Sequence, residues 1–220
     1  MDNVKGFYTS FVSTDAKVRG LEFHIERMLE NAKIYGVKLN EAQLIEGLIQ
    51  VPKSGQCFVR INYLLSNDSI EVLQRQVPPS VNKPLKVELK EHCRPTPERK
   101  WFDDQPKKSA TEQLYCKDGR VLEGATWALV AVVNGEFVAP KANVLPSTTI
   151  AMFNAYSTNE KITQRDVTLK DLFNSQELVS ANSTHGFRPI IVVDGVDFNS
   201  GSFFEKLLVG WNSIPTSALS

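Results

Sequence analysis

The feature that most constrains this chain is one carboxylate, Glu123, which lies among segments typical of buried β-strands. Leu114–Cys116 is typical of a short strand, and Asp118–Gly119 favours a two-residue hairpin turn that leads back towards Glu123. The almost unbroken apolar run Trp127–Val133 predicts a strand buried on both faces. Because a buried carboxylate is costly without a cation or a donor, we predict that Glu123 has a partner.

The same stretch ends in a turn rich in hydroxyl groups. Ser147, Thr148 and Thr149 precede a run over residues 150–156 that can form a helix. Hydroxyl groups and backbone N–H groups at a helix start can bind an anion, or the hydroxyl can simply cap the helix. From these residues alone both alternatives stay open.

The first part of the chain predicts a strand followed by an amphipathic helix. Phe7–Thr14 alternates as a strand does, and a helix that ends at Gly36 is indicated by apolar residues at helical spacing, namely Leu21, Ile25, Met28, Leu29 and Ala32. Arg27 projects away from this apolar stripe, as a solvent-exposed arginine or a ligand-binding one would. Asn40 is suited to cap a second helix.

Two proline-containing breaks, at residues 76–84 and 93–97, interrupt the middle of the chain, and we place the domain boundary at the second. The predicted domains are residues 1–93, a loop over 94–97, and residues 98–220. Further strands are expected at 58–65, 69–74, 85–89, 177–181 and 189–193, and helices at 169–173 and 203–209. A short helix is also expected near Pro106, capped by Asp103 or Asp104.

Composition and motifs exclude several classes of function. Lys plus Arg and Asp plus Glu number 25 each, so no net charge attracts nucleic acid or an anionic membrane. No apolar run approaches the roughly 20 residues that span a bilayer, and the first residues lack a secretory signal, so we expect a cytoplasmic protein. Three scattered cysteines and three scattered histidines predict neither a disulfide framework nor a metal site. Dinucleotide, phosphate-loop and zinc-protease motifs do not occur.

Four segments together resemble the class IV aminotransferase family, the pyridoxal-phosphate enzymes of fold type IV. They are FYTSF, GLEFHIERMLENAKIYGV, VLEGATWALVAVVNGEFVAPKANVLPSTT and LVSANSTHGFRPIIVVDG. Within the family the chain looks most similar to aminodeoxychorismate lyase and to the short members, with D-amino-acid and branched-chain aminotransferases as relatives. The resemblance implies an α+β fold with a small N-terminal α/β domain and a larger, barrel-like C-terminal domain. It also implies a homodimer that binds pyridoxal 5'-phosphate and a small-molecule amine substrate.

The resemblance gives roles to the residues singled out above. Arg27 falls on the H-x-x-R helix, whose arginine holds the cofactor phosphate, and Glu123 falls on the glutamate that pairs with the pyridine nitrogen. The implied cofactor-binding residues are Arg27, Glu123, Thr148, Thr149, Asn182 and Ser183. Thr148 and Thr149 match the phosphate-binding turn, and Ser183, next to Asn182, matches a second phosphate-binding position.

The position of the catalytic lysine follows less directly from the resemblance. Lys100 follows the proline break in surroundings that resemble the lysine segment of the short members, and we expect it to form the Schiff base. Lys90 matches better by its distance in sequence from Glu123, but it ends a strand. Arg94 would be a replacement that cannot form a Schiff base.

The expected function is therefore a pyridoxal-phosphate-dependent lyase or aminotransferase acting on an amino acid or an aminodeoxychorismate-like amine. Two positions depart from the family pattern, since Ala128 stands where Asn is usual and Ile150 where Arg is frequent. These departures support an alternative, a degenerate homologue without classical catalysis. A serine hydrolase is disfavoured because no nucleophile-elbow motif occurs.

Overall fold

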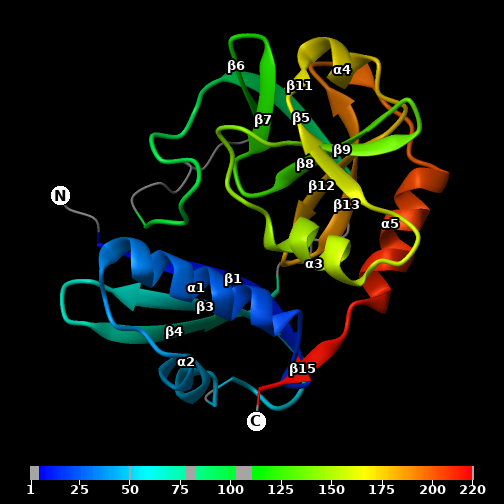
Figure 1. Ribbon diagram of the computed structural model, residues 1–220. Helices are drawn as coiled ribbons and strands as arrows, with labels where there is room; N and C mark the ends of the chain where they lie inside the picture. The colour runs from blue at the N-terminus through cyan, green and yellow to red at the C-terminus, as the bar shows by residue number, and fades with distance from the viewer. Residues whose placement is uncertain (1–4, 50, 78–82, 103–110, 220) are drawn as a thin grey trace. The chain divides into compact units, whose positions relative to one another are not determined.

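The structure is a computed structural model that describes residues 5–49, 51–77, 83–102 and 111–219. The chain forms two compact units (Figure 1). Unit 1 combines residues 1–81, 99–105 and 215–220, and unit 2 combines residues 82–98 and 106–214. Each unit is thus built from stretches that are separated in the sequence.

Unit 1 contains a five-stranded sheet in the order β15-β2-β1-β3-β4. Its strands are β1 (Gly6–Thr14), β2 (Lys17–Arg19), β3 (Gln56–Leu64), β4 (Ser69–Arg75) and β15 (Thr216–Ala218). All neighbours are antiparallel. The strand β15, although late in the sequence, therefore forms an edge of the sheet that contains β1.

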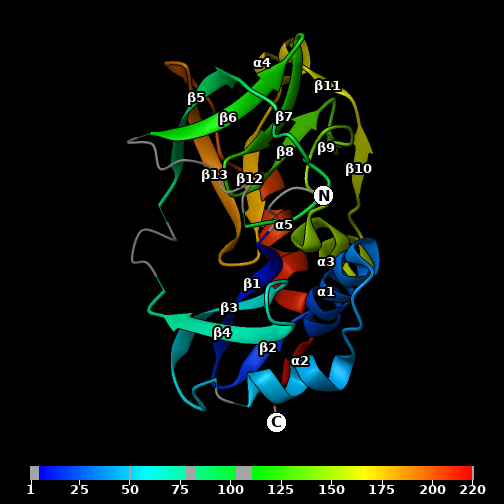
Figure 2. The ribbon, with the colours of Figure 1, turned by 90° about the vertical axis from the view of Figure 1, so that its left-hand side faces the viewer.

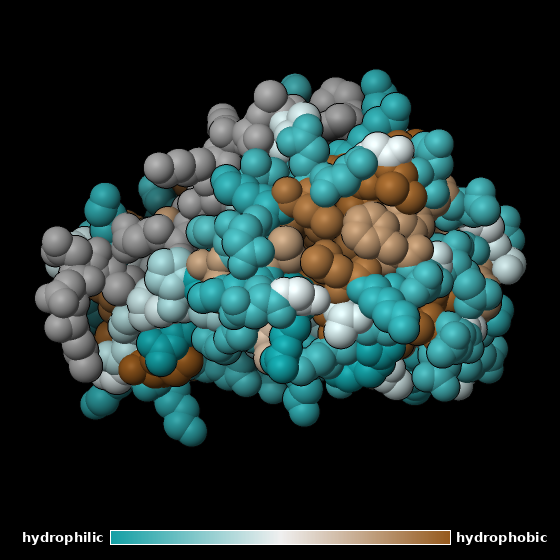
Figure 3. Space-filling model, turned by 90° about the horizontal axis from the view of Figure 1, so that it is seen from above, coloured by the Kyte–Doolittle hydropathy of each residue, from teal (hydrophilic) through white to brown (hydrophobic). Residues whose placement is uncertain are grey.

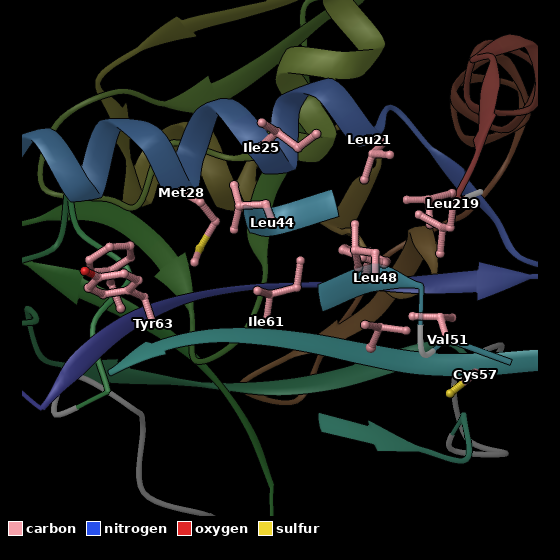
Figure 4. Close-up of a cluster of buried hydrophobic side chains, with 14 of the residues drawn as sticks. Leu21, Ile25, Met28, Leu44, Leu48, Val51, Cys57, Ile61, Tyr63 and Leu219 are labelled. Atoms are coloured by element: carbon pink, nitrogen blue, oxygen red, sulfur yellow. The ribbon is translucent and has the colours of Figure 1, made fainter. Parts of the chain in front are cut away.

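Two helices, α1 (Leu21–Tyr35) and α2 (Glu41–Leu48), cover one face of this sheet. The predicted stripe of α1 is buried, and the helix ends at Gly36, whose φ of 67° is the left-handed conformation that glycine adopts easily. Asn40 forms a capping box with Gln43 at the start of α2, as the sequence indicated. Figure 4 shows side chains of both helices, of β3 and of Leu219 converging on one core.

Unit 2 is organised around a closed barrel. Its elements are β5 (Leu85–Glu91), β6 (Glu112–Lys117), β7 (Arg120–Gly124), β8 (Ala128–Val133), β9 (Glu136–Pro140), α3 (Thr148–Tyr156), β10 (Ile162–Arg165), β11 (Val167–Thr168), α4 (Leu169–Phe173), β12 (Leu178–Asn182), β13 (Gly186–Val193), β14 (Val196–Asp197) and α5 (Ser202–Ser213). Among the described residues, six strands form a ring in the order β8-β12-β13-β5-β6-β7, which a pairing of β7 with β8 closes (Figure 2). The expected barrel-like sheet is confirmed.

Hairpin chemistry explains how the barrel strands are connected. Asp118 and Gly119 have φ values of 50° and 73°, and Asn134 and Gly135 have values of 52° and 80°. Two successive positive φ values define the turn whose twist matches that of paired strands, which is why both hairpins predicted from these dipeptides form. They place Glu123 in β7, next to the seam of the ring.

The helices α3, α4 and α5 of unit 2 are fixed by polar groups at their starts. Ser147 caps α3, and Thr168 forms a capping box with Asp171 at the start of α4. The carboxylate of Glu177 accepts the backbone N–H groups of Phe203 and Phe204 at 3.2 and 2.9 Å, near the start of α5. Figure 3, which looks onto the end of unit 2 that carries α4, shows apolar residues framed by hydrophilic ones.

The division into units differs from the expected boundary at residues 94–97. β5, which we placed in the N-terminal domain, pairs with β6 and β13 in the barrel, because its apolar residues alternate towards the barrel core. Conversely, β15 returns to unit 1, so residues 98–220 are not one domain. The short strands β2, β10, β11, β14 and β15 were not predicted from the sequence. The expected helix near Pro106 and its cap at Asp103 or Asp104 lie outside the described residues.

Candidate functional site

Glu123 is buried, with 7% of its surface exposed, and it has the partners that burial demands. The Nε and Nη2 atoms of Arg94 donate hydrogen bonds to its Oε1 at 2.8 and 2.6 Å, and the Leu145 N–H donates to its Oε2 at 3.2 Å. Arg94 Nη2 also donates to the Pro97 carbonyl at 2.9 Å. Arg94, which was considered as a replacement for the catalytic lysine, is the ion-pair partner of Glu123.

Tyr115 of β6 lies in the electrostatic field of this ion pair. Burial raises the pKa of Tyr115, the positive charge of Arg94 opposes this rise, and the negative charge of Glu123 adds to it. The His92 ring contacts the Tyr115 ring edge-on at 4.6 Å between centroids. Arg94 and Glu123 therefore act electrostatically on a buried aromatic side chain, Tyr115, which packs against the His92 ring.

The start of α3 presents a second group of polar atoms. Ser147 accepts the Ile150 N–H through its hydroxyl at 3.3 Å, so the cap is Ser147 and neither threonine. Thr149 is fully buried, and its Oγ1 has no hydrogen-bond partner within the described part of the chain. A buried hydroxyl without a partner costs about 1 to 3 kcal/mol, so this atom indicates a missing ligand or solvent. The anion-binding alternative gains support for Thr149.

The turn between β12 and β13 is held by Asn182 itself. Its Oδ1 accepts the backbone N–H groups of Thr184 and His185 at 2.9 and 3.2 Å, and its Nδ2 donates to the Thr126 carbonyl at 3.4 Å. Asn182 thus shapes the turn that presents Ser183, which is half-buried. Burial, with the positive charge of Arg188 adding to it, lowers the pKa of His185 to about 3.

In unit 1, Arg27 lies near a buried histidine. His24 Nδ1 and Thr9 Oγ1 are hydrogen-bonded at 2.8 Å, and His24 Nε2 has no partner among the described residues. Burial, with the positive charges of Arg27 and Lys100 adding to it, lowers the pKa of His24 to about 3. The two basic residues predicted for the site therefore create one electropositive region in unit 1.

Lys100 is half-buried, and its main chain lies beside β1. Its carbonyl accepts the Tyr8 N–H at 3.1 Å, and the next residue, Trp101, bridges to Phe7. Its Nζ lies 5.1 Å from the centre of the Tyr8 ring, which Arg60 also approaches, with its Cζ at 3.7 Å. Lys90, in contrast, is exposed and donates to Gln113 Oε1 at 3.3 Å.

One residue of the candidate site was not predicted in its observed role. Arg94 was considered only as a substitute for a lysine, and its contact with Glu123 spans 29 positions of the chain, so no local pattern indicates it. The departures from the family pattern have local explanations. Ile150 is buried in an apolar cluster, and Ala128 pairs with Glu123 across the barrel seam.

Other sites are less informative. A groove of about 640 Å³ in unit 1 is lined by α1, α2 and β15, and none of the predicted site residues lines it. No cluster of three or more His, Cys, Asp or Glu suited to a metal ion occurs within the described ranges. Of the helices in the described part of the chain, none has the length and apolar character needed to cross a bilayer.

Comparison with known proteins agrees with this architecture. Residues 107–193 match the family model described as amino-transferase class IV. The fold is similar to that of a hypothetical aminotransferase from Mycobacterium tuberculosis in its PLP-bound form, at a TM-score of 0.78 and 15% identity over 94% of this chain and 88% of that one. Comparison with curated protein sequences finds no match.

Two further solved structures have similar folds, with comparable TM-scores and sequence identities. The 4-amino-4-deoxychorismate lyase from Pseudomonas aeruginosa has a TM-score of 0.73 and 19% identity over 93% of this chain and 89% of that one. The branched-chain aminotransferase from Thermoproteus uzoniensis with norvaline has a TM-score of 0.78 and 15% identity over 94% and 84%. The chain therefore has the fold of the class IV aminotransferases, and residues 107–193 carry the sequence pattern of that family. The resemblance inferred from the sequence is confirmed.

Proposed function

We propose that this chain binds pyridoxal 5'-phosphate and acts as a lyase or an aminotransferase on the amino group of an amino acid or an aminodeoxychorismate-like amine. The observation that carries the proposal is the fully buried, unsatisfied hydroxyl of Thr149 at the start of α3. The helix start has its own cap in Ser147, so the protein itself gives this hydroxyl no structural task. A phosphate would satisfy it.

The resemblance assigns residues of this chain to the parts of the cofactor. Its phosphate would be held by Arg27, by Thr148 and Thr149 with the backbone N–H groups at the start of α3, and by Ser183 next to Asn182. A guanidinium suits a phosphate because its donors form a planar fork, and a helix start favours an anion. Glu123 would hold the pyridine nitrogen, since it is a buried carboxylate that already accepts charged donors.

The remaining role, the covalent link to the cofactor, is assigned to Lys100. When bound, the cofactor supplies an aldehyde that condenses with amines and a ring that withdraws electrons from the neighbouring carbon. The Lys100 Nζ would also be the group that moves the proton of the substrate carbon next to the nitrogen.

Borohydride reduction of the protein incubated with pyridoxal phosphate, followed by peptide mass spectrometry, tests the assignment. We expect a stable label on the peptide that contains Lys100. Lys100→Ala should lose the label, and the matched control Lys90→Ala should keep it. A label on Lys90 would move the site to β5, and no label on any lysine would favour the degenerate homologue over the enzyme.

Reaction type, assembly and location are part of the same proposal. An aminotransferase consumes a keto acid as amino acceptor and a lyase does not, so the dependence of turnover on added keto acid separates the two. The three cysteines are free thiols, which supports a reducing compartment such as the cytoplasm. The homodimer implied by the fold family is measured directly by light scattering coupled to size-exclusion chromatography.

A further inference from the structure

The ion pair of Arg94 with Glu123 is deeply buried. The side chains are 11% and 9% exposed, whereas those of the pair formed by Arg120 and Asp166 are 55% and 49% exposed. Both Arg94 donors fall on one carboxylate oxygen, Oε1, and the Leu145 N–H approaches the other. The carboxylate is thereby fixed in orientation from two sides.

Arg94 has a second attachment that links the carboxylate to the chain leading to Lys100. Its Nη2 donates to the carbonyl of Pro97, three residues before Lys100. Removing Arg94 would therefore release this segment and take from the buried carboxylate the cation that Arg94 supplies. The second effect dominates, because separating a buried carboxylate from its guanidinium is more costly than losing one hydrogen bond to a carbonyl.

We infer that Arg94 is a positioning residue that balances the charge of Glu123 before the cofactor binds and shares the carboxylate with the cofactor's ring nitrogen afterwards. This inference rests on the proposed function. A carboxylate has about four acceptor positions, so it can serve an arginine and a ring nitrogen together. The two cations then repel each other, and Glu123 attracts the protonated ring nitrogen less strongly than an unpaired carboxylate would.

The inference predicts opposite effects of one substitution on the protein with and without cofactor. Arg94→Met should lower the melting temperature of the protein alone, because Glu123 loses the positive charge that Arg94 supplies. Saturating pyridoxal phosphate should then raise the melting temperature more in Arg94→Met than in wild type, since the ring nitrogen supplies a positive charge in its place. A tenfold gain in apparent affinity corresponds to an additional rise of roughly 3–6 °C for a chain of this length.

Three further variants separate this role from a purely structural one. Arg94→Lys keeps the charge and should show the cofactor-induced rise of wild type. In Arg94→Met combined with Glu123→Gln the uncompensated charge is gone, so the protein alone should regain stability and the additional rise should disappear. Arg120→Met removes an exposed arginine of the same unit and should change neither quantity.

Each possible outcome of these measurements either supports or overturns the inference about Arg94. An equal cofactor-induced rise in wild type and Arg94→Met would overturn the inference, because a structural loss is the same with and without cofactor. If Arg94→Met does not fold alone, refolding on addition of pyridoxal phosphate supports the inference, and failure to refold while the double variant folds overturns it. A wild-type protein that shows neither a melting shift nor a lysine label instead refutes the proposed function.

Discussion

Glu123 pairs with Ala128 across the bridge that joins β7 to β8, and this pair closes the barrel. The residue to which we assign the ring nitrogen therefore also lies at the seam of the fold. Its main chain joins the two strands, and its side chain is held by Arg94. Stability and cofactor chemistry are thus coupled at this position.

The first prediction concerns that coupling. Glu123→Ala should lower the free energy of unfolding of the protein without cofactor by about 3–5 kcal/mol, because it leaves Arg94 buried without its counter-charge. Glu123→Gln should cost less, since the amide oxygen can still accept a hydrogen bond. Urea denaturation measures both, and Glu136→Ala, an exposed position on the neighbouring hairpin, is the control. A loss no larger than that of the control would show that the pair contributes little.

The second prediction concerns the phosphate. Arg27→Ala should weaken the binding of pyridoxal phosphate by about 1.5–3 kcal/mol, or roughly tenfold to 150-fold, because a charge-assisted hydrogen bond is lost. Lys33→Ala removes an exposed positive charge from the same helix and should bind as wild type does. Titration followed by absorbance measures both affinities, and equal affinities would remove Arg27 from the site.

The third prediction is a pH effect that needs no cofactor. His24 has a folded-state pKa of about 3, below its ordinary value of 6.5 in the unfolded chain. Between these values the unfolded chain binds a proton that the folded protein does not, so stability should fall as the pH decreases from about 6.5 towards 3. Replacing Lys100 by Met should raise the pKa of His24, because a repelling charge is gone.

Nuclear magnetic resonance of the His24 ring protons measures this titration directly. A wild-type His24 that titrates near pH 6.5 would contradict the burial of its ring, and a Lys100→Met variant without an upward shift would contradict the placement of Lys100 near His24. A shift of the expected sign would support the electropositive region even in a protein that turns out to have no catalytic activity.

The fourth prediction concerns α5. Glu177→Ala should destabilise the protein by about 1–3 kcal/mol, because two backbone N–H groups at the start of α5 lose a buried carboxylate. Glu205→Ala, an exposed position in the first turn of the same helix, should cost much less. Thermal unfolding of the two variants gives the comparison, and equal losses would argue against this cap.

Much of the fold could be predicted because local chemistry agrees with the final structure. The two hairpin dipeptides at 118–119 and 134–135, the glycine that ends α1 and the cap at Asn40 all act within a few residues of themselves. The barrel was predicted only through the family resemblance. Its closure depends on β5 pairing with β13, strands about a hundred residues apart, and no local pattern encodes such a pairing.

The candidate site also has a part that could be predicted from the sequence and a part that could not. The burial of Glu123 could be predicted from the strands around it, and the hydroxyl-rich turn at Thr149 from its place before a helix. The partner of Glu123 could not, because Arg94 is 29 positions away and reaches it through the folding of a proline-rich crossing. The expected domain boundary at residues 94–97 differs from the division into units for a related reason. Proline-containing breaks indicate turns in the chain, but they do not indicate which sheet the next strand joins.

The return of β15 to the sheet of unit 1 has a consequence for biosynthesis. A ribosome makes β1 and β2 early and β15 only after the barrel strands and α5, so the β2 edge of the unit 1 sheet stays unpaired while the residues of unit 2 are being made. An unpaired edge is a template for unwanted pairing with other chains. The nascent protein is thus most exposed to aggregation in the interval before Thr216–Ala218 leave the exit tunnel, and its yield should depend on how quickly those residues follow.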